Sequence, residues 1–387
     1  MSKQPVIILG AGATKACGGP LTAEILPQAI ELRAELDRED FIQRLEQFLV
    51  DTFHLPEAVN RRKDRHYPAL PLLISLLDIA IDRKHSLGKS RNDDGAVWDT
   101  DQLEEVRESL EYAVFAVLER QLRPIRRNEC LKLIQSVFTR RTWEPHIVSL
   151  NYDLISDNSL MTLSERRPVN RDLKGERRGC FPDYGCDVAT ELYRRSPHKF
   201  GLLLKLHGSL NWLFCPGCSR LDIGISSSGR RMVKMLDALW REDPQEQLDL
   251  EQRYTCQGSP CPECEASVRP VMITPTHMKD YRNPHIAQVW YRAERVLRQS
   301  DRAIIVGYSL PDDDVDVTYL LKRGLGHLPP ERITVVEYDR RKRPRRATQH
   351  PVGQRYVTLF GEKIDWHPEG LATYVESVRQ RGHGNPG

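Results

Sequence analysis

The chain lacks any apolar run that approaches the roughly 20 residues needed to cross a lipid bilayer. It also lacks the pattern of a secretion signal, because the apolar run that begins at Pro5 is short and no small-residue cleavage site follows it. Internal repeats and low-complexity tracts are missing as well. We therefore expect a soluble, cytoplasmic protein with no membrane partner.

A strong charge of one sign is also missing. The 387 residues include 57 Lys and Arg against 54 Asp and Glu, a net charge of +3 at pH 7, which is too small to predict a nucleic-acid partner by itself. Basic residues still gather in two runs, at 61–66 and 340–346. Such runs are usually solvated, and both direct nucleic-acid contact and docking onto an acidic partner surface stay open.

What the chain does contain is a series of short apolar runs without polar alternation. They lie at 6–9, 146–150, 202–206, 270–274, 302–307 and 332–338. Runs of this kind are typical of parallel strands covered on both faces. Stretches with helical spacing separate several of them, for example at 286–299. The pattern predicts an α/β fold with a doubly wound, Rossmann-like parallel sheet.

The domain organisation follows from where these strands stop and resume. Residues 31–142 have mainly helical patterning, and we expect them to form an insertion in a Rossmann-type domain made of 1–30 and 143–345. The remaining 346–387 would be a C-terminal extension whose last eight residues form a disordered tail.

Four of the nine cysteines form two C-x-x-C pairs, at Cys215, Cys218, Cys261 and Cys264. Four thiolates suit a closed, tetrahedral, structural zinc site, so we expect a small zinc module at 211–269. The alternatives are four reduced surface thiols or a redox pair, and a redox pair would need an exposed thiol of low pKa. Cys256 could replace one ligand if a pair has shifted.

Small or polar residues follow almost every expected strand, where ligands of open α/β sheets bind. Each group alone has a simpler interpretation, such as a tight glycine turn, an Asn/Asp turn or a packed histidine. Their convergence on one edge predicts a nucleotide site. The groups are Gly10-Ala11-Gly12, Asn151-Tyr152-Asp153, His207-Gly208-Ser209, Gly307-Tyr308-Ser309 and Glu337.

The order of these groups resembles a known family. The motifs GAGAT, SLNYD, KLHGS, the two cysteine pairs, RPVMITP and SDRAIIVGYSLPDDD occur in the order seen in sirtuins, between about residues 5 and 339. The GYSLP and NYD motifs resemble the sirtuin-like domains of bacterial antiphage defence proteins more than they resemble protein deacylases.

This resemblance implies a role for each matching position. Asn151 would lie beside the nicotinamide ribose of NAD+, Asp153 would contact the nicotinamide amide, and His207 would be the general base. The phosphates and the adenosine half would contact the remaining matches, which are Gly10, Ala11, Gly12, Thr14, Gly307, Tyr308, Ser309 and Glu337.

One departure bears on the activity. Deacylases have a Pro-Phe-Arg pattern after the first turn, whereas this chain reads TKACGGPLTAEIL at 14–26. The resemblance therefore implies an NAD+ glycohydrolase that releases nicotinamide and ADP-ribose and acts in antiphage defence by depleting NAD+. An NAD-dependent lysine deacylase and a non-catalytic NAD- or ADP-ribose-binding subunit are the alternatives.

The resemblance also implies partners. The chain is similar to stand-alone subunits that assemble into homo-oligomers, some with a HerA-type ATPase. Because constant NAD+ cleavage would harm the host, we expect restraint, and the helical insertion and the basic segment 340–346 are candidates for oligomer contacts or for gating. The sequence leaves the trigger and any cleavage of NADP open.

Overall fold

The computed structural model describes residues 4–53, 55, 67–88, 97–122, 127–138, 144–165, 180–196, 198–226, 231–232, 260–272, 283–312 and 314–383. The basic run 61–66 and Cys256 lie outside these residues. The described chain divides into two compact units, one made from 1–18, 125–273 and 280–387, the other mainly from 19–124.

The first unit is built on a parallel sheet, which has seven strands in the described part of the chain, in the order β12-β11-β10-β1-β4-β6-β5. Every neighbouring pair is parallel. The strands are β1 (Pro5–Leu9), β4 (His146–Ser149), β5 (Phe181–Asp183), β6 (Lys199–Lys205), β10 (Arg302–Val306), β11 (Ile333–Val336) and β12 (Asp365–His367).

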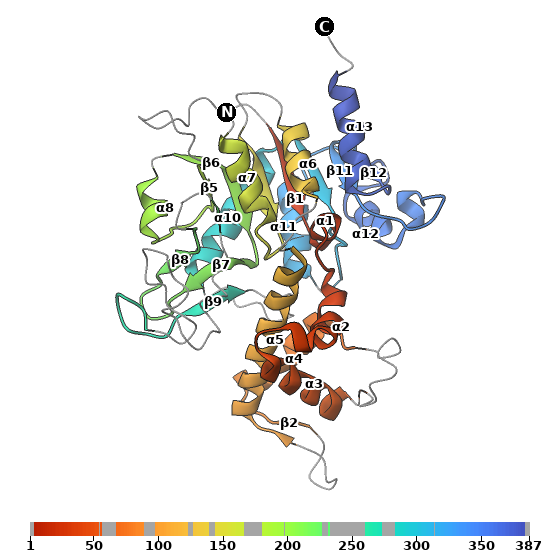
Figure 1. Ribbon diagram of the computed structural model, residues 1–387. Helices are drawn as coiled ribbons and strands as arrows, with labels where there is room; N and C mark the ends of the chain where they lie inside the picture. The colour runs from red at the N-terminus through yellow and green to blue at the C-terminus, as the bar shows by residue number, and fades with distance from the viewer. Residues whose placement is uncertain are drawn as a thin grey trace. The chain divides into compact units, whose positions relative to one another are not determined.

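Helices cover both faces of this sheet, as Figure 1 shows for α6 and α7 on one side and α10 and α11 on the other. The predicted doubly wound sheet is thus confirmed. The helices of this unit are α1 (Ala11–Ala16), α6 (Glu129–Val137), α7 (Ile155–Glu165), α8 (Glu191–Arg195), α10 (Pro284–Gln299), α11 (Val315–Leu325), α12 (Pro351–Phe360) and α13 (Leu371–His383).

The central strand β1 shows why the sheet forms here. All five of its residues are buried, and branched side chains pack well on a pleated surface covered from both sides. The chain passes from β1 to β4 on one side and later returns to β10 on the other. The direction of strand order therefore reverses at β1, and ligands of such sheets bind where this reversal occurs.

One expectation about the sheet was wrong. The run 270–274 was expected to form a parallel strand, but β9 (Arg269–Met272) pairs antiparallel with β7 (Gly208–Phe214) in a separate small sheet, which β8 (Leu221–Ile223) completes. An apolar run shows that a strand is buried but not which strand it pairs with.

The C-terminal region also takes part in the sheet. It contributes the edge strand β12, which pairs with β11, and α13 extends to His383, into the tail that was expected to be disordered. The strand has only three half-buried residues, too few for an apolar pattern to reveal it. Residues 384–387 lie outside the described part of the chain.

The second unit is helical, with α2 (Thr22–Glu31), α3 (Glu39–Phe53), α4 (Leu70–Asp82) and α5 (Thr100–Leu122), plus a short hairpin of β2 (Leu87–Gly88) and β3 (Val97–Trp98). One face of α5 is buried, including Leu103, Val106 and Leu110. The exact bounds of the insertion stay a proposal, since α6 belongs to the first unit. No helix among the described residues is long and apolar enough to cross a membrane.

Candidate functional site

The glycine turn after β1 packs directly against the turn after β10. The N–H of Gly12 donates to the carbonyl of Gly307 at 2.8 Å, and that of Gly10 donates to Val306 at 2.9 Å. A Cβ on Gly12 would lie 2.6 Å from the Cα of Gly307, and Gly307 itself has a φ of +59°. Only glycine permits this approach of two backbones. Ala11, between the two glycines of the first turn, is the first residue of the short helix α1.

Asn151 joins the end of β4 to the same turn. Its side-chain Nδ2 donates to the carbonyl of Gly10 at 2.9 Å. Its side-chain oxygen accepts no hydrogen bond from the described residues. The half-buried amide is therefore held in place on one side and still offers an acceptor on the other.

Asp153 is buried and faces protein on both carboxylate oxygens. One oxygen accepts from the N–H of Ile155 at 2.9 Å, in the first turn of α7. The other accepts from the hydroxyl of Thr14 at 2.5 Å. Burial raises the pKa of Asp153, against the opposing charge of Lys205. Asp153 and Thr14 thus meet each other and tie α1 to the start of α7.

His207 follows β6 and is 4% exposed. Its Nδ1 lies 3.2 Å from the carbonyl of Leu150. Because a carbonyl only accepts, Nδ1 carries the proton and Nε2 is the basic nitrogen of the neutral ring. The ring also lies 6.4 Å from that of Tyr152, centroid to centroid. The histidine is therefore oriented beside the Asn151 loop.

The residues expected on the adenosine side lie after β10 and β11. Tyr308 is buried, and its hydroxyl donates to Asp314 at 2.6 Å. Ser309 is exposed. The half-buried Glu337 accepts from the N–H of Tyr338 at 2.9 Å, and burial raises the pKa of its carboxyl. The N–H of Gly307 donates to Val336, which brings the two strand ends together.

Two residues of α12 hold these strand ends, and sequence reasoning missed both. Tyr356 is fully buried, and its hydroxyl donates to the carbonyl of Tyr308 at 2.8 Å. Arg355 donates to the carbonyl of Ser309 at 2.9 Å. Nothing in the local pattern of 351–360 marks them, because their partners are backbone carbonyls distant in the chain.

Lys205 was also missed, although the sequence carried a signal for it. A lysine within the apolar run LLLKL needs buried partners. Its ammonium donates to the carbonyl of Asp153 at 2.6 Å and to the carboxylate of Asp157 at 3.0 Å. Lys205 and Asp157 are both fully buried. Lys205 therefore fixes the backbone of the Asn151–Asp153 loop through a hydrogen bond to the carbonyl of Asp153.

The four predicted metal ligands form one cluster. The sulfurs of Cys215, Cys218, Cys261 and Cys264 all lie within 4.8 Å of one another. Two of the sulfur pairs are 3.4 and 3.6 Å apart, too far for disulfides. Tetrahedral zinc with bonds of about 2.3 Å places its sulfurs about 3.8 Å apart. The sulfur separations, from 3.4 Å to no more than 4.8 Å, bracket this spacing, so the four residues suit a zinc ion.

The two halves of the cluster have the same backbone geometry. The N–H of Cys215 donates to Arg220, and that of Cys261 donates to Ala266, each five residues on. Ser219 and Glu265, just after the second cysteine of each pair, have φ of +60° and +61°. Although burial opposes it, hydrogen bonding by the backbone of Cys218 and by the thiol of Cys264 lowers the pKa of Cys215 to about 7, which favours the thiolate that binds metal.

The basic segment 340–346 is anchored at one point and exposed elsewhere. Arg345 pairs with Asp339 at 2.9 Å, and this hydrogen bond lowers the pKa of Asp339 to about 2. The indole of Trp366 donates to the carbonyl of Arg345 at 3.0 Å. The other basic side chains of the segment are exposed to solvent.

No protein-family model and no curated protein matches the chain. Solved structures that are similar to it include a Sir2 mutant with a p53 peptide and NAD, at 9% identity, covering 99% of this chain and 94% of that one, with a TM-score of 0.42. Another is a Sir2 homologue mutant in complex with ADP-ribose, at 13% identity, covering 100% and 96%, with a TM-score of 0.40. At these values the likenesses carry no argument about activity, and the fold assignment rests on the strand order itself.

Proposed function

We propose that this protein is an NAD+ glycohydrolase, which hydrolyses the bond between nicotinamide and ribose. The observation that supports this most is the convergence of the glycine turn, Asn151 and His207 at the carboxyl edge of the sheet, where the strand order reverses. The resemblance of the same motifs to sirtuin-like domains of bacterial defence proteins supplies the substrate.

The chemistry needs few protein groups. The glycosidic bond breaks with both electrons moving to the ring nitrogen of nicotinamide, which neutralises its positive charge, and a water oxygen bonds to the ribose carbon. Asn151 would use its side-chain oxygen to orient the ribose or the water. His207 would take the proton of the water at Nε2, either directly or through a ribose hydroxyl.

Other site residues would position these two. The close contact between Gly12 and Gly307 brings the two turns together, and the pyrophosphate would lie along the backbone beside them. Asp153, bound to Thr14 and Ile155, would hold the loop, and any contact with the nicotinamide amide would add to these bonds. Glu337 would accept from the adenosine ribose.

We also propose that the four-cysteine cluster holds a structural zinc ion. Its closed set of four sulfurs leaves no ligand position for a substrate. Antiphage defence, homo-oligomer formation and a HerA-type ATPase partner belong to the same proposal and have the resemblance alone as their support.

The deciding experiment is to incubate purified protein with NAD+, with and without an acetylated peptide, and to quantify nicotinamide, ADP-ribose and acyl-ADP-ribose. We expect ADP-ribose without peptide, and at least about a 100-fold lower rate in Asn151→Ala and His207→Ala. Turnover that requires the peptide would identify a deacylase instead. NAD+ binding without turnover would favour the non-catalytic subunit.

Matched controls come from the same fold. Asn158 also donates its side-chain amide to a backbone carbonyl, that of Met232 at 3.3 Å. His327 also faces a carbonyl, that of Ser300 at 2.9 Å. Neither lies at a strand end of the predicted site, so Asn158→Ala and His327→Ala should keep the wild-type rate. An equal loss in the controls would contradict the assignment of the site.

A further inference from the structure

The basic segment 340–346 lies between β11 and α12 (Figure 1) and concentrates positive charge on one short loop. None of its residues is assigned to NAD+ or to the four-cysteine cluster, so neither proposal accounts for it. Five of its seven side chains are exposed cations, and the segment contains no acidic residue. The five are Arg340, Arg341, Lys342, Arg343 and Arg346.

The segment has a defined shape because Asp339, a buried residue at its start, binds it at two points. The carboxylate of Asp339 accepts from the backbone N–H of Arg341 at 3.3 Å and from that of Arg345 at 3.0 Å. The N–H of Asp339 donates to the carbonyl of Pro368 at 2.9 Å, just after β12. The segment is therefore fastened to the folded chain, whereas a solvated tail would have no such contacts.

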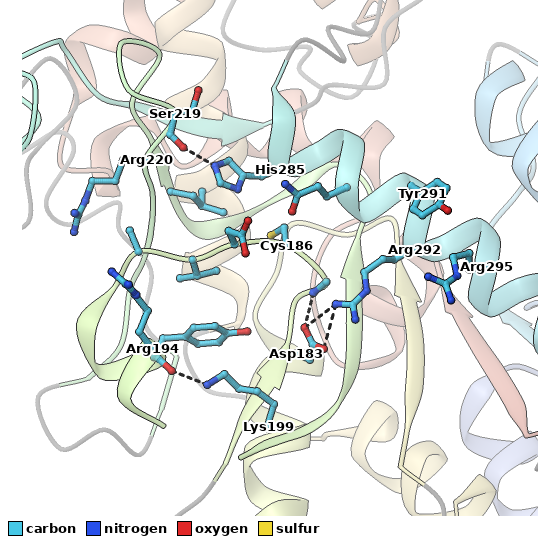
Figure 2. A pocket seen from close by; sticks show the side chains of 17 residues that line it. Asp183, Cys186, Arg194, Lys199, Ser219, Arg220, His285, Tyr291, Arg292 and Arg295 are labelled. Carbon is cyan, nitrogen blue, oxygen red and sulfur yellow. Dashed lines mark hydrogen bonds and ion pairs between the residues drawn. The ribbon is translucent and has the colours of Figure 1, made fainter. Parts of the chain in front are cut away.

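The five exposed cations pair with no carboxylate of the described residues, in contrast to another basic region of the molecule. Figure 2 shows that region, a pocket beside α10, where the guanidinium of Arg292 pairs with Asp183 at 3.3 Å. Arg220 at the same pocket pairs with Asp222 at 2.6 Å. Unmatched cations on one short loop repel one another. An anion with many charges would relieve this repulsion.

The surroundings of the segment favour nucleic acid over an acidic protein. Protein interfaces have an apolar core, but Tyr338, which is 64% exposed, is the only large exposed hydrophobic residue that the structure describes between β11 and α12. Proteins that bind single strands combine cations along the phosphate backbone with aromatic rings on which bases stack. The major groove of a duplex instead admits a helix or a two-stranded ribbon, and residues 340–346 form neither.

We propose that the segment 340–346 binds single-stranded nucleic acid. Its five exposed cations would contact phosphates along the strand, and the ring of Tyr338 would stack on a base. Asp339 would hold the loop in the shape that presents these cations. The proposal does not depend on whether the protein cleaves NAD+, because no cation of the segment belongs to the proposed NAD+ site.

The test is fluorescence anisotropy of a labelled oligothymidine of about 20 nucleotides, titrated with the full chain at several salt concentrations. If all five cations contact phosphates, the logarithm of the binding constant should fall with the logarithm of the salt concentration with a slope of about −3.5. Lys342→Gln together with Arg343→Gln should weaken binding at least about tenfold and make the slope shallower by about 1.4. Tyr338→Ala should weaken binding about fivefold or more without changing the slope.

The matched control is Arg83→Gln together with Lys84→Gln. These residues are also an adjacent arginine and lysine, both exposed, and they follow α4, far from the segment in the sequence. Removing the same two charges there should leave the affinity and the slope unchanged. Lys342→Arg together with Arg343→Lys keeps both charges of the segment and should retain the affinity. Thermal unfolding would confirm that each variant is folded.

Five results would overturn the proposal. The first is the absence of binding, and the second is equal weakening in the control pair, which would reveal diffuse surface electrostatics. The third is tighter binding of a duplex of the same length, which would remove the role of Tyr338. The fourth is equal affinity for poly-glutamate, which would favour an acidic protein as the partner. The fifth is loss of binding only in Asn151→Ala, which would place the strand at the proposed NAD+ site.

Discussion

Two regions of the molecule are built in opposite ways. One is the strand-end site, made of the glycine turn, Asn151, His207 and Gly307. The other is the four-cysteine module around Cys215, Cys218, Cys261 and Cys264. The module consists of two local knuckles, each with its ligands three residues apart and the same backbone turn. The strand-end site draws on residues spread over almost 300 positions of the sequence. Asn151 bonds to Gly10, His207 to the carbonyl of Leu150 and Gly307 to Gly12. The first region depends on local spacing, and the second depends on the order of strands in the sheet.

This difference predicts that the two regions respond differently to loss of metal and to substitution of buried residues. The module should depend on one added component, the metal, because its four cysteines form no disulfide and two of them are exposed. The strand-end site should depend on buried groups within the chain, above all Lys205 and the facing glycines. Three substitutions test this contrast.

The largest effect should come from the metal ligands. Cys261→Ser should lose most of the roughly one zinc per chain that we expect in the wild type, and should destabilise the module by about 5 kcal/mol or more, because metal binding supplies its folding energy. Elemental analysis and thermal unfolding measure this. Cys180→Ser, at a thiol outside the cluster, should retain zinc, and equal zinc loss in both variants would argue against the site.

The next effect should come from the buried lysine. Lys205→Met should lower the free energy of unfolding by about 3–5 kcal/mol, since it leaves the carboxylate of Asp157 buried without its cation. Lys199 lies at the other end of β6 and also donates to two carbonyls, but it has no buried carboxylate. Denaturant unfolding should show a clearly smaller loss for Lys199→Met, and similar losses would remove the special role of Lys205.

The smallest of the three concerns the facing glycines. Gly307→Ala combines a φ of +59° with a Cβ 2.4 Å from the Cα of Gly12, which should cost about 2–4 kcal/mol and displace the glycine turn. Gly18 has a φ of +100° but nothing within 4 Å of an added Cβ. Gly18→Ala should therefore cost only about 1–2 kcal/mol. Equal costs in denaturant unfolding would show that backbone strain, and not the contact, decides.

Much of the sheet could be predicted from the chain because buried parallel strands are uniformly apolar. Five of the expected runs correspond to β1, β4, β6, β10 and β11. Strand β12 could not be recognised, since three half-buried residues leave no periodic pattern. The pairing of β9 with β7 could not be recognised either, because pairing depends on register between distant segments and not on composition.

In the candidate site, too, some residues could be recognised from the sequence and others could not. The residue types after each strand were visible. A lysine in an apolar run was a signal that Lys205 needs a buried partner, but nothing in the sequence marked Asp157 as that partner. The bonds from Arg355 and Tyr356 to backbone carbonyls were not visible, since a carbonyl acceptor carries no side-chain signature.

The order of residues was enough to show which segments are buried, which four cysteines are close enough in spacing to share a metal, and which polar residues follow the strands. These are properties of spacing and hydrophobicity, which act along the chain. Folding in three dimensions was needed to bring Asp153 to Thr14, Gly12 to Gly307 and Lys205 to Asp157. Contacts of this kind depend on how strands and helices pack, because packing brings together residues that no local pattern connects.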